Sequence, residues 1–306
     1  MVENRSRVDD VAEAIRSMKI RGARDIAILS VETLRDLMSS GASIGELRSA
    51  SMKLKLARPS AVSLPNAVNY VLYLAESNKL LSKKDFTEKT LAGINGFLEG
   101  LNKSLEDIAE IGSRLIEDGD TVMTHCNSDT AIGVIKKAWS DGKKINAVCT
   151  ESRPRHQGYL SAKMLSEHGI PTTLIIDSAV HHMMKALEVD KVIVGADTIC
   201  ANGDVINKIG TSQIALCAHS MDVDFIVAAE SLKFSPESLF GRTVAIEERD
   251  SKEVADIQGV AIRNPGFDVT EAQYVDMIIT EEGVMPPQAA YHLLKEKYKW
   301  DILKKK

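Results

Sequence analysis

Gly195-Ala-Asp-Thr-Ile-Cys-Ala-Asn-Gly-Asp-Val-Ile-Asn-Lys-Ile-Gly-Thr-Ser-Gln213 is the stretch that decides how the chain folds. The apolar run 191–194 before it predicts a buried strand, which places Asp197 at or just past a strand's carboxyl end, where open α/β sheets bind ligands. Asn202-Gly203 predicts a tight turn. Asn207 and Lys208 then lead into residues 209–218, which have helical apolar spacing. An ordinary turn with polar caps fits this stretch equally well.

Short apolar, β-branched runs dominate the chain from about residue 118, and helical patterns separate most of them. Strands that alternate with helices indicate a parallel sheet with crossover connections, so we expect an α/β, Rossmann-like, doubly wound domain over residues 118–306. The predicted strands are 121–124, 145–149, 172–176, 192–194, 225–229 and 277–280. No G-x-G-x-x-G follows a strand, so the sequence implies no dinucleotide cofactor.

Residues 1–117 are expected to form a helical N-terminal domain. Apolar residues recur at helical spacing over 8–18 and 26–37, prolines punctuate the region 59–65, and residues 86–115 form one long amphipathic pattern or two joined helices.

The amino-acid composition argues against several classes of protein function. The 306 residues are 44% hydrophobic and 26% charged with a net charge of −5, which gives no general signal for nucleic-acid or membrane binding. The N-terminus lacks an apolar signal-peptide core, so we expect a cytoplasmic protein. No cysteine falls in a C-x-x-C pair and no H-E-x-x-H appears, so we expect no metal and no cofactor.

Polar clusters follow four of the predicted strands, at 125–130, 151–158, 177–178 and 197. The carboxyl ends of parallel strands share one edge of a sheet, so Cys126 and Asp197 can meet there. Cys126 precedes a predicted helix, whose dipole together with Arg153 and Arg155 would favour a thiolate. A buried inert cysteine and capping aspartates are the alternatives.

Two arginine-bearing pieces of the helical region suit a phosphate. Arg21 and Arg24 flank Gly22-Ala23 at a helix junction, and Arg58 stands before a proline that can open a helix. Solvated loop arginines are the alternative.

Several motifs occur in order along nearly the whole chain, and together they resemble the superfamily of aldose-phosphate isomerases and initiation factor 2B. They are Arg21-Gly-Ala, Arg58-Pro-Ser-Ala-Val, Thr124-His-Cys-Asn, Glu151-Ser-Arg-Pro-Arg-x-Gln-Gly158, Gly195-Ala-Asp, Asn202-Gly-Asp-x-x-Asn-Lys-Ile-Gly-Thr211, Asn264-Pro-x-Phe-Asp-Val-Thr270 and Ile279-Thr-Glu-Glu-Gly283. The resemblance implies a helical N-terminal domain, a Rossmann-like domain, and a homo-oligomer, either a dimer or a trimer of dimers.

Within that superfamily, the regulatory subunits of initiation factor 2B generally lack the catalytic cysteine and aspartate, whereas this chain has Cys126 and Asp197. Methylthioribose-1-phosphate isomerases usually carry a glycine- and alanine-rich stretch after Cys-Asn. The short, polar Cys126-Asn-Ser-Asp-Thr here, together with Arg24, is similar to the archaeal ribose-1,5-bisphosphate isomerases. A methylthioribose-1-phosphate isomerase and a non-catalytic regulatory subunit remain the alternatives.

The resemblance implies a reaction from α-D-ribose 1,5-bisphosphate to D-ribulose 1,5-bisphosphate, with a role in nucleotide salvage. Cys126 as thiolate would move the carbon proton, and Asp197 would handle the oxygen protons. The resemblance also implies a set of substrate-binding residues. Lys208 and Asn207 would stabilise developing oxyanion charge, and Gln157 would bind sugar hydroxyls. The phosphates would be bound by Arg21, Arg24, Arg58 and Arg153, and Gly22, Ala23 and Ser128 complete the implied substrate-binding set.

Overall fold

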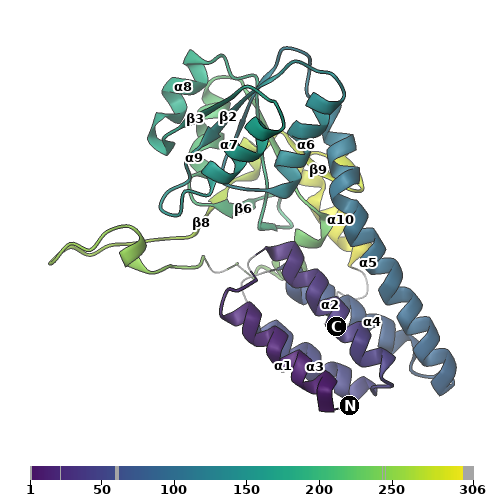
Figure 1. The fold of residues 1–306 in the computed structure, drawn as a ribbon. Helices are drawn as coiled ribbons and strands as arrows, with labels where there is room; N and C mark the ends of the chain where they lie inside the picture. The colour runs from purple at the N-terminus through teal and green to yellow at the C-terminus, as the bar shows by residue number, and fades with distance from the viewer. Residues whose placement is uncertain (1, 21, 59–61, 243, 245, 299–306) are drawn as a thin grey trace. The chain divides into compact units, whose positions relative to one another are not determined.

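The computed structural model describes residues 2–20, 22–58, 62–242, 244 and 246–298. The chain forms two compact units (Figure 1). Unit 1 comprises residues up to 103 together with those from 295 onward, and unit 2 comprises residues 104–294.

Unit 1 is helical, as the sequence predicts. Its helices are α1 (Val2–Arg16), α2 (Ala23–Ser39), α3 (Ile44–Ala57), α4 (Ser63–Asn78) and the first part of α5 (Lys83–Ser113). Each buries the apolar side of its helical repeat, and Ile15, Ile26, Leu34, Leu47 and Leu64 are fully buried in the core. A capping box sets the start of α3: the Ser43 hydroxyl accepts from the Glu46 N–H, and the Glu46 carboxylate accepts from the Ser43 N–H.

Helix α5 is continuous over 31 residues, so the long amphipathic pattern forms one helix and not two. The division between the units falls inside it, between residues 103 and 104. Its last turns pack closely on α6 (Asp129–Ser140) in unit 2. A Cβ on Gly112 would lie 2.6 Å from a methyl group of Val134, so only glycine allows this approach.

Unit 2 is built on a seven-stranded sheet of order β10-β9-β7-β4-β1-β2-β3. The strands are β1 (Thr121–Thr124), β2 (Asn146–Thr150), β3 (Thr172–Ile175), β4 (Lys191–Val194), β7 (Asp224–Ala228), β9 (Met277–Thr280) and β10 (Gly283–Met285). Every pair is parallel except β10 with β9. The α/β prediction and all six predicted strands are therefore confirmed.

Helices connect the parallel strands. They are α6, α7 (Gly158–Glu167), α8 (Val180–Ala186) and α9 (Thr211–Ser220), and α10 (Ala290–Lys297) follows the sheet. The end of α5, α6 and α7 share one buried cluster with residues of β1, β2, β4, β7 and β9. This cluster forms a hydrophobic core of unit 2.

The sheet reverses its strand order between β1 and β4. From β1 the chain steps outward through β2 to β3, and from β4 it steps the other way through β7 to β9. In doubly wound folds the crevice at such a switch point is where ligands bind. Cys126 follows β1 and Asp197 follows β4, so the two residues flank the switch point.

A second, antiparallel sheet was not predicted. It has the order β5-β6-β8, formed by β5 (Thr198–Ile199), β6 (Val205–Lys208) and β8 (Phe267–Thr270). The predicted Asn202-Gly203 turn joins β5 to β6, and Gly203 has φ +89° there. Asn207 and Lys208 are thus the last residues of a strand and not part of a helix start.

A long excursion interrupts unit 2 before β8. Residues 246–262, light green in Figure 1, extend away from the sheets and include one short 3-10 helix, Ser251–Glu253. Across the described residues, no helix is long and apolar enough to span a bilayer.

Candidate active site

Three non-glycine residues at the carboxyl edge of the sheet have left-handed backbone conformations. Cys126 after β1 has φ 65°, and Ser152 and His156 after β2 have φ 59° and 52°. Such conformations cost energy for residues with a Cβ and gather at functional sites. The cluster marks the ends of β1 and β2 as a candidate site.

Cys126 is buried, with 8% of its surface exposed. Its N–H donates to the Ser152 hydroxyl at 2.8 Å, and its thiol donates to the Gln157 side-chain oxygen at 3.5 Å. Gln157 lies one residue before Gly158, where a Cβ would come 1.7 Å from the Thr150 carbonyl oxygen. Glycine at 158 therefore lets the loop that carries Gln157 fold tightly against β2.

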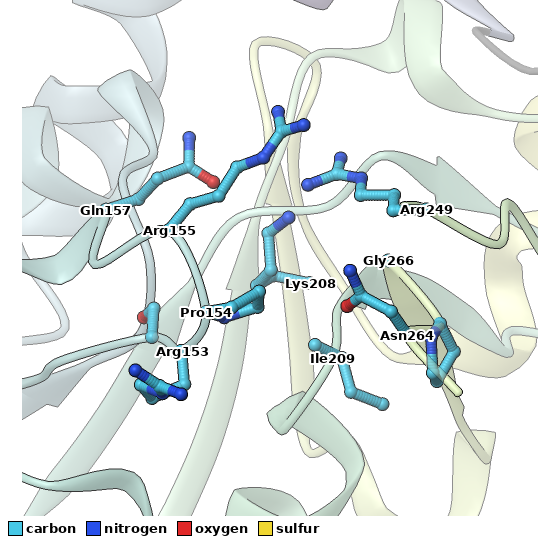
Figure 2. A pocket seen from close by; sticks show the side chains of 11 residues that line it. Arg153, Pro154, Arg155, Gln157, Lys208, Ile209, Arg249, Asn264 and Gly266 are labelled. Atoms are coloured by element: carbon cyan, nitrogen blue, oxygen red, sulfur yellow. The ribbon is translucent and has the colours of Figure 1, made fainter. Parts of the chain in front are cut away.

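Burial raises the pKa of the Cys126 thiol, while the nearby Lys208 ammonium acts in the opposite direction. The net effect raises this pKa, whereas the expected thiolate requires a lowered one. The expectation relied partly on two arginines: the Arg153 side chain points away from the pocket (Figure 2), and Arg155 is paired with Glu253.

Asp197 lies three residues past β4, on the other side of the switch point. Its N–H donates to the Ile206 carbonyl at 2.9 Å, which anchors it to the small sheet. Its charge acts on both the Cys126 thiol and the Lys208 ammonium, so the three groups share one electrostatic environment. The structure brings together the cysteine and aspartate that the sequence placed 71 residues apart (197 − 126).

Lys208 is a buried cation at the end of β6, with 7% of its surface exposed. Its ammonium lies 5.1 Å from the centre of the Phe267 ring, and within the described residues it has no hydrogen bond or ion pair. Burial lowers its pKa, and the charges of Arg249 and Arg155 act in the same direction. A desolvated, unneutralised cation of this kind favours binding of an anion.

Asn207 is also buried, but its side-chain amide has a partner. The amide N–H₂ donates to the Thr211 hydroxyl at 3.1 Å, and that hydroxyl donates to the Lys208 carbonyl at 2.6 Å. These bonds hold the end of β6 against the first turn of α9.

A polar pocket opens beside Lys208. Figure 2 shows the Lys208 ammonium pointing toward the guanidinium groups of Arg155 and Arg249, with Gln157 and Asn264 at the sides. Arg249 is a buried cation with 10% of its side chain exposed; it lies 5.3 Å from the Phe267 ring centre. Lys208 and Arg249 therefore share one aromatic platform.

Carboxylates stand opposite both arginines. Arg155 makes a two-point contact with Glu253, including a 2.9 Å bond from Nε. The Nε of Arg249 lies 3.5 Å from Glu247. A phosphate in this pocket would compete with these two carboxylates for the guanidinium groups.

The sequence interpretation missed Arg249 and Asn264 as pocket residues and assigned Arg155 no contact with a ligand. Asn264 begins the motif Asn264-Pro-x-Phe-Asp-Val-Thr270, and this motif could have indicated the residue. Arg249 lies in an irregular segment without strand or helix periodicity, so no pattern in the sequence connects it with Lys208.

The end of β7 adds a buried ion pair that was also missed. Lys233 lies 3.4 Å from Glu230, with side chains 14% and 6% exposed. Burial would lower the pKa of Lys233, but the Glu230 and Asp197 carboxylates outweigh it and raise that pKa. The Ser235 N–H donates to the Ile199 carbonyl at 2.8 Å, which holds this segment alongside the strand that follows Asp197. The signal was the position of these residues after a predicted strand.

Ser128 caps α6, and its side chain accepts from the Ala131 N–H. It also contacts the Thr130 hydroxyl at 2.8 Å. A Cβ on Gly195 would lie 2.2 Å from the Ser128 hydroxyl oxygen, so glycine at 195 allows the ends of β1 and β4 to approach.

The remaining predicted residues belong to unit 1. Arg21 lies outside the described residues. Gly22 caps α2, which begins at Ala23. The Arg24 guanidinium donates to the Leu101 carbonyl at 3.0 Å and to the Asn102 side chain at 3.3 Å. Arg58 is the half-buried residue that ends α3.

Comparison with known proteins shows which family the chain belongs to. The family model described as "Initiation factor 2 subunit family" matches residues 19–287. Ribose 1,5-bisphosphate isomerase of Archaeoglobus fulgidus is 49% identical over 296 residues, covering 94% of this chain and 92% of the relative. The enzyme of the same name from Methanocaldococcus jannaschii is 45% identical over 303 residues, covering 96% of each chain. A solved structure of translation initiation factor eIF-2B from Pyrococcus horikoshii superposes with a TM-score of 0.77 at 31% identity, covering 92% of this chain and 97% of the other. The chain therefore belongs to the initiation factor 2 subunit family.

Proposed function

We propose that this protein is an isomerase that converts α-D-ribose 1,5-bisphosphate to D-ribulose 1,5-bisphosphate. One observation carries the proposal: Cys126 and Asp197 flank the switch point of the sheet, beside a pocket in which Arg155, Lys208 and Arg249 converge. The relatives named ribose 1,5-bisphosphate isomerase support the same substrate.

The reaction needs proton transfers and no net oxidation. The bond between C1 and the ring oxygen breaks as that oxygen gains a proton, and C2 loses a proton to give an enolate-type intermediate. C1 then gains a proton while the C2 hydroxyl loses one to become the ketone. Cys126 takes the proton from C2 and returns one to C1, and Asp197 transfers the protons of the ring oxygen and the C2 hydroxyl. Each group acts once as a base and once as an acid.

The charges around Cys126 suit this work. The Cys126 sulfur lies 3.5 Å from the Gln157 side-chain oxygen, which accepts when the sulfur is protonated. Cys126 takes the C2 proton as a thiolate, and the Lys208 ammonium and the Arg249 guanidinium stabilise that sulfur anion, since both act to lower its pKa. Lys208 is also placed to stabilise charge on an enolate oxygen, and a preorganised buried donor is effective there.

The pocket favours a phosphate over a methylthio group. Its lining includes Arg155, Gln157, Lys208, Arg249 and Asn264, all of which offer hydrogen-bond donors. Planar guanidinium groups bind phosphate oxygens in two-point contacts. We propose Arg21, Arg24 and Arg58, with Gly22 and Ala23, as further substrate-binding residues.

An isomerase assay on ribose 1,5-bisphosphate and on 5-methylthioribose 1-phosphate tests the proposal, with wild type, Cys126→Ser and Asp197→Asn side by side. We expect wild type to turn over the bisphosphate and both variants to lose at least about 10³-fold in kcat, as loss of an essential proton-transfer group does. Turnover of the methylthio sugar alone would keep the chemistry and reject the substrate. No turnover of either sugar would reject the enzyme proposal.

We also infer a homo-oligomer. Leu174 and Ile176 at the edge strand β3 are 45% and 57% exposed, and exposed apolar side chains on a sheet edge favour association. Light scattering after size exclusion should give a dimer or a trimer of dimers; a monomer at micromolar concentration would reject this inference.

A further inference from the structure

We propose that His125 is a positioning residue: a neutral imidazole whose two ring nitrogens hold the Cys126 and Lys208 backbones in place for proton transfer. Its effect on turnover depends on the proposed isomerase function. Its hydrogen bonds and tautomer can be tested without any substrate.

His125 joins three segments that are distant in sequence. It lies between β1 and Cys126 and is 1% exposed. Its Nδ1 lies 2.6 Å from the Thr150 hydroxyl at the end of β2, and its Nε2 lies 2.9 Å from the Ile209 carbonyl after β6. One ring therefore ties the cysteine-bearing strand end to both neighbouring parts of the site.

The partners decide the tautomer. A carbonyl oxygen can only accept, so Nε2 carries the proton and donates to Ile209, and Nδ1 accepts from the Thr150 hydroxyl. Both nitrogens are thus used in the neutral ring, and a second proton on Nδ1 would require the Thr150 hydroxyl to turn from donor to acceptor. Burial lowers the pKa of His125, and Lys208 acts in the same direction, while Asp177 and the Ile209 carbonyl oppose them.

The backbone around the imidazole leaves space for the ring. A Cβ on Gly210 would lie 3.2 Å from Cε1 and Nε2, so the imidazole packs against bare backbone at a residue with φ +104°. On the other side, the Ser152 hydroxyl lies 3.3 Å from Nδ1 and accepts the Cys126 N–H at 2.8 Å. The ring therefore reaches Cys126 through Ser152 and Lys208 through Ile209.

Two substitutions separate the two bonds. His125→Gln can place an amide donor near the Ile209 carbonyl but loses the acceptor for Thr150. His125→Asn can place an acceptor near Thr150 but does not reach Ile209. His168→Gln is the matched control, because His168 is exposed and contacts only the Ser140 hydroxyl among the described residues.

We expect kcat on ribose 1,5-bisphosphate to fall about 100-fold in His125→Asn and about 10-fold in His125→Gln, since small misplacements of reacting groups cost this much. KM should change far less, because Arg155 and Arg249 do not depend on the ring. Alkylation of Cys126 by iodoacetamide, followed by peptide mass spectrometry, should speed up in both variants as the strand end loosens. The control should match wild type in every measurement.

Nitrogen-15 NMR of the histidines in the wild-type chain tests the proposal even if a variant fails to fold. We expect a neutral ring protonated on Nε2 between pH 8 and pH 5.5. A ring protonated on Nδ1, or one that titrates near its ordinary value of about 6.5, would overturn the proposal. So would variants with wild-type kcat and wild-type alkylation of Cys126. If the wild type lacks isomerase activity, the NMR and alkylation results still decide the positioning role, and only the proposed function fails.

Discussion

Arg24 in unit 1 and Lys208 in unit 2 differ in what their own chain leaves for a ligand. In unit 1, Arg24 gives its guanidinium to a backbone carbonyl and an asparagine of α5. In unit 2, Arg249 and the nearby Lys208 are about nine-tenths buried, and Lys208 has no anionic or hydrogen-bonding partner among the described residues. A basic motif thus indicates charge, whereas availability for phosphate depends on the surrounding contacts.

Lys208 should give the largest effect if this contrast is correct. We expect Lys208→Met to lower kcat/KM about 10³-fold, because it removes a buried cation from both the anion pocket and the sulfur of Cys126. Steady-state kinetics on the bisphosphate measures this. Lys252→Met is the control, since Lys252 is exposed in the excursion. Equal activities of the two variants would remove Lys208 from the site.

Arg249→Ala should act mainly on binding. We expect KM to rise roughly 10- to 100-fold, since a hydrogen bond to a charged group contributes about 1.5–3 kcal/mol. Arg263→Ala is the matched control, because Arg263 pairs with Glu248 and is 82% exposed. A KM for Arg249→Ala no higher than that of the control would show that the substrate phosphate binds elsewhere.

Arg24→Ala should act mainly on stability. Loss of its bonds to α5 should lower the free energy of unfolding by about 1 kcal/mol, with a smaller rise in KM than Arg249→Ala produces. Urea unfolding and steady-state kinetics measure the two effects. An unchanged unfolding curve with a KM rise equal to that of Arg249→Ala would show that substrate releases Arg24 from α5, and the contrast between the units would not hold.

The inner strands of the parallel sheet could be predicted because they are buried on both faces. The runs 121–124 and 277–280 are apolar and β-branched, and β1 and β9 occupy those same residues. The small sheet could not be predicted from periodicity. β5 has two residues and β6 ends in Asn207-Lys208, so neither shows an apolar pattern. β6 is held by pairing with β5 on one side and with β8, some 60 residues later, on the other.

The candidate site was predictable where residues follow strands. Cys126, Gln157 and Asp197 lie within a few residues of strands that the sequence indicates, so the edge of the sheet gathers them. The charge state of Cys126 was harder to predict from the sequence. Proximity to a helix start favours a thiolate, but burial and the acceptor on Gln157 favour the thiol, and both depend on packing. Arg249 enters the pocket through tertiary contacts alone.

A buried histidine and an exposed one provide a similar comparison, with the smallest expected effect. Burial lowers the pKa of His125 in the folded protein, so below pH of about 6.5 the unfolded chain binds a proton that the folded chain does not. The free energy of unfolding should therefore fall as pH drops from 7.5 to 5.5, by at most about 1.4 kcal/mol per pH unit from this residue. Urea unfolding of wild type and His125→Asn over that range isolates the contribution, because the variant lacks the titrating group. His168→Gln, which keeps His125, is the control variant. Parallel slopes for wild type and His125→Asn would mean that His125 takes up its proton as readily in the folded chain, and that its bonds to Thr150 and Ile209 do not keep it neutral.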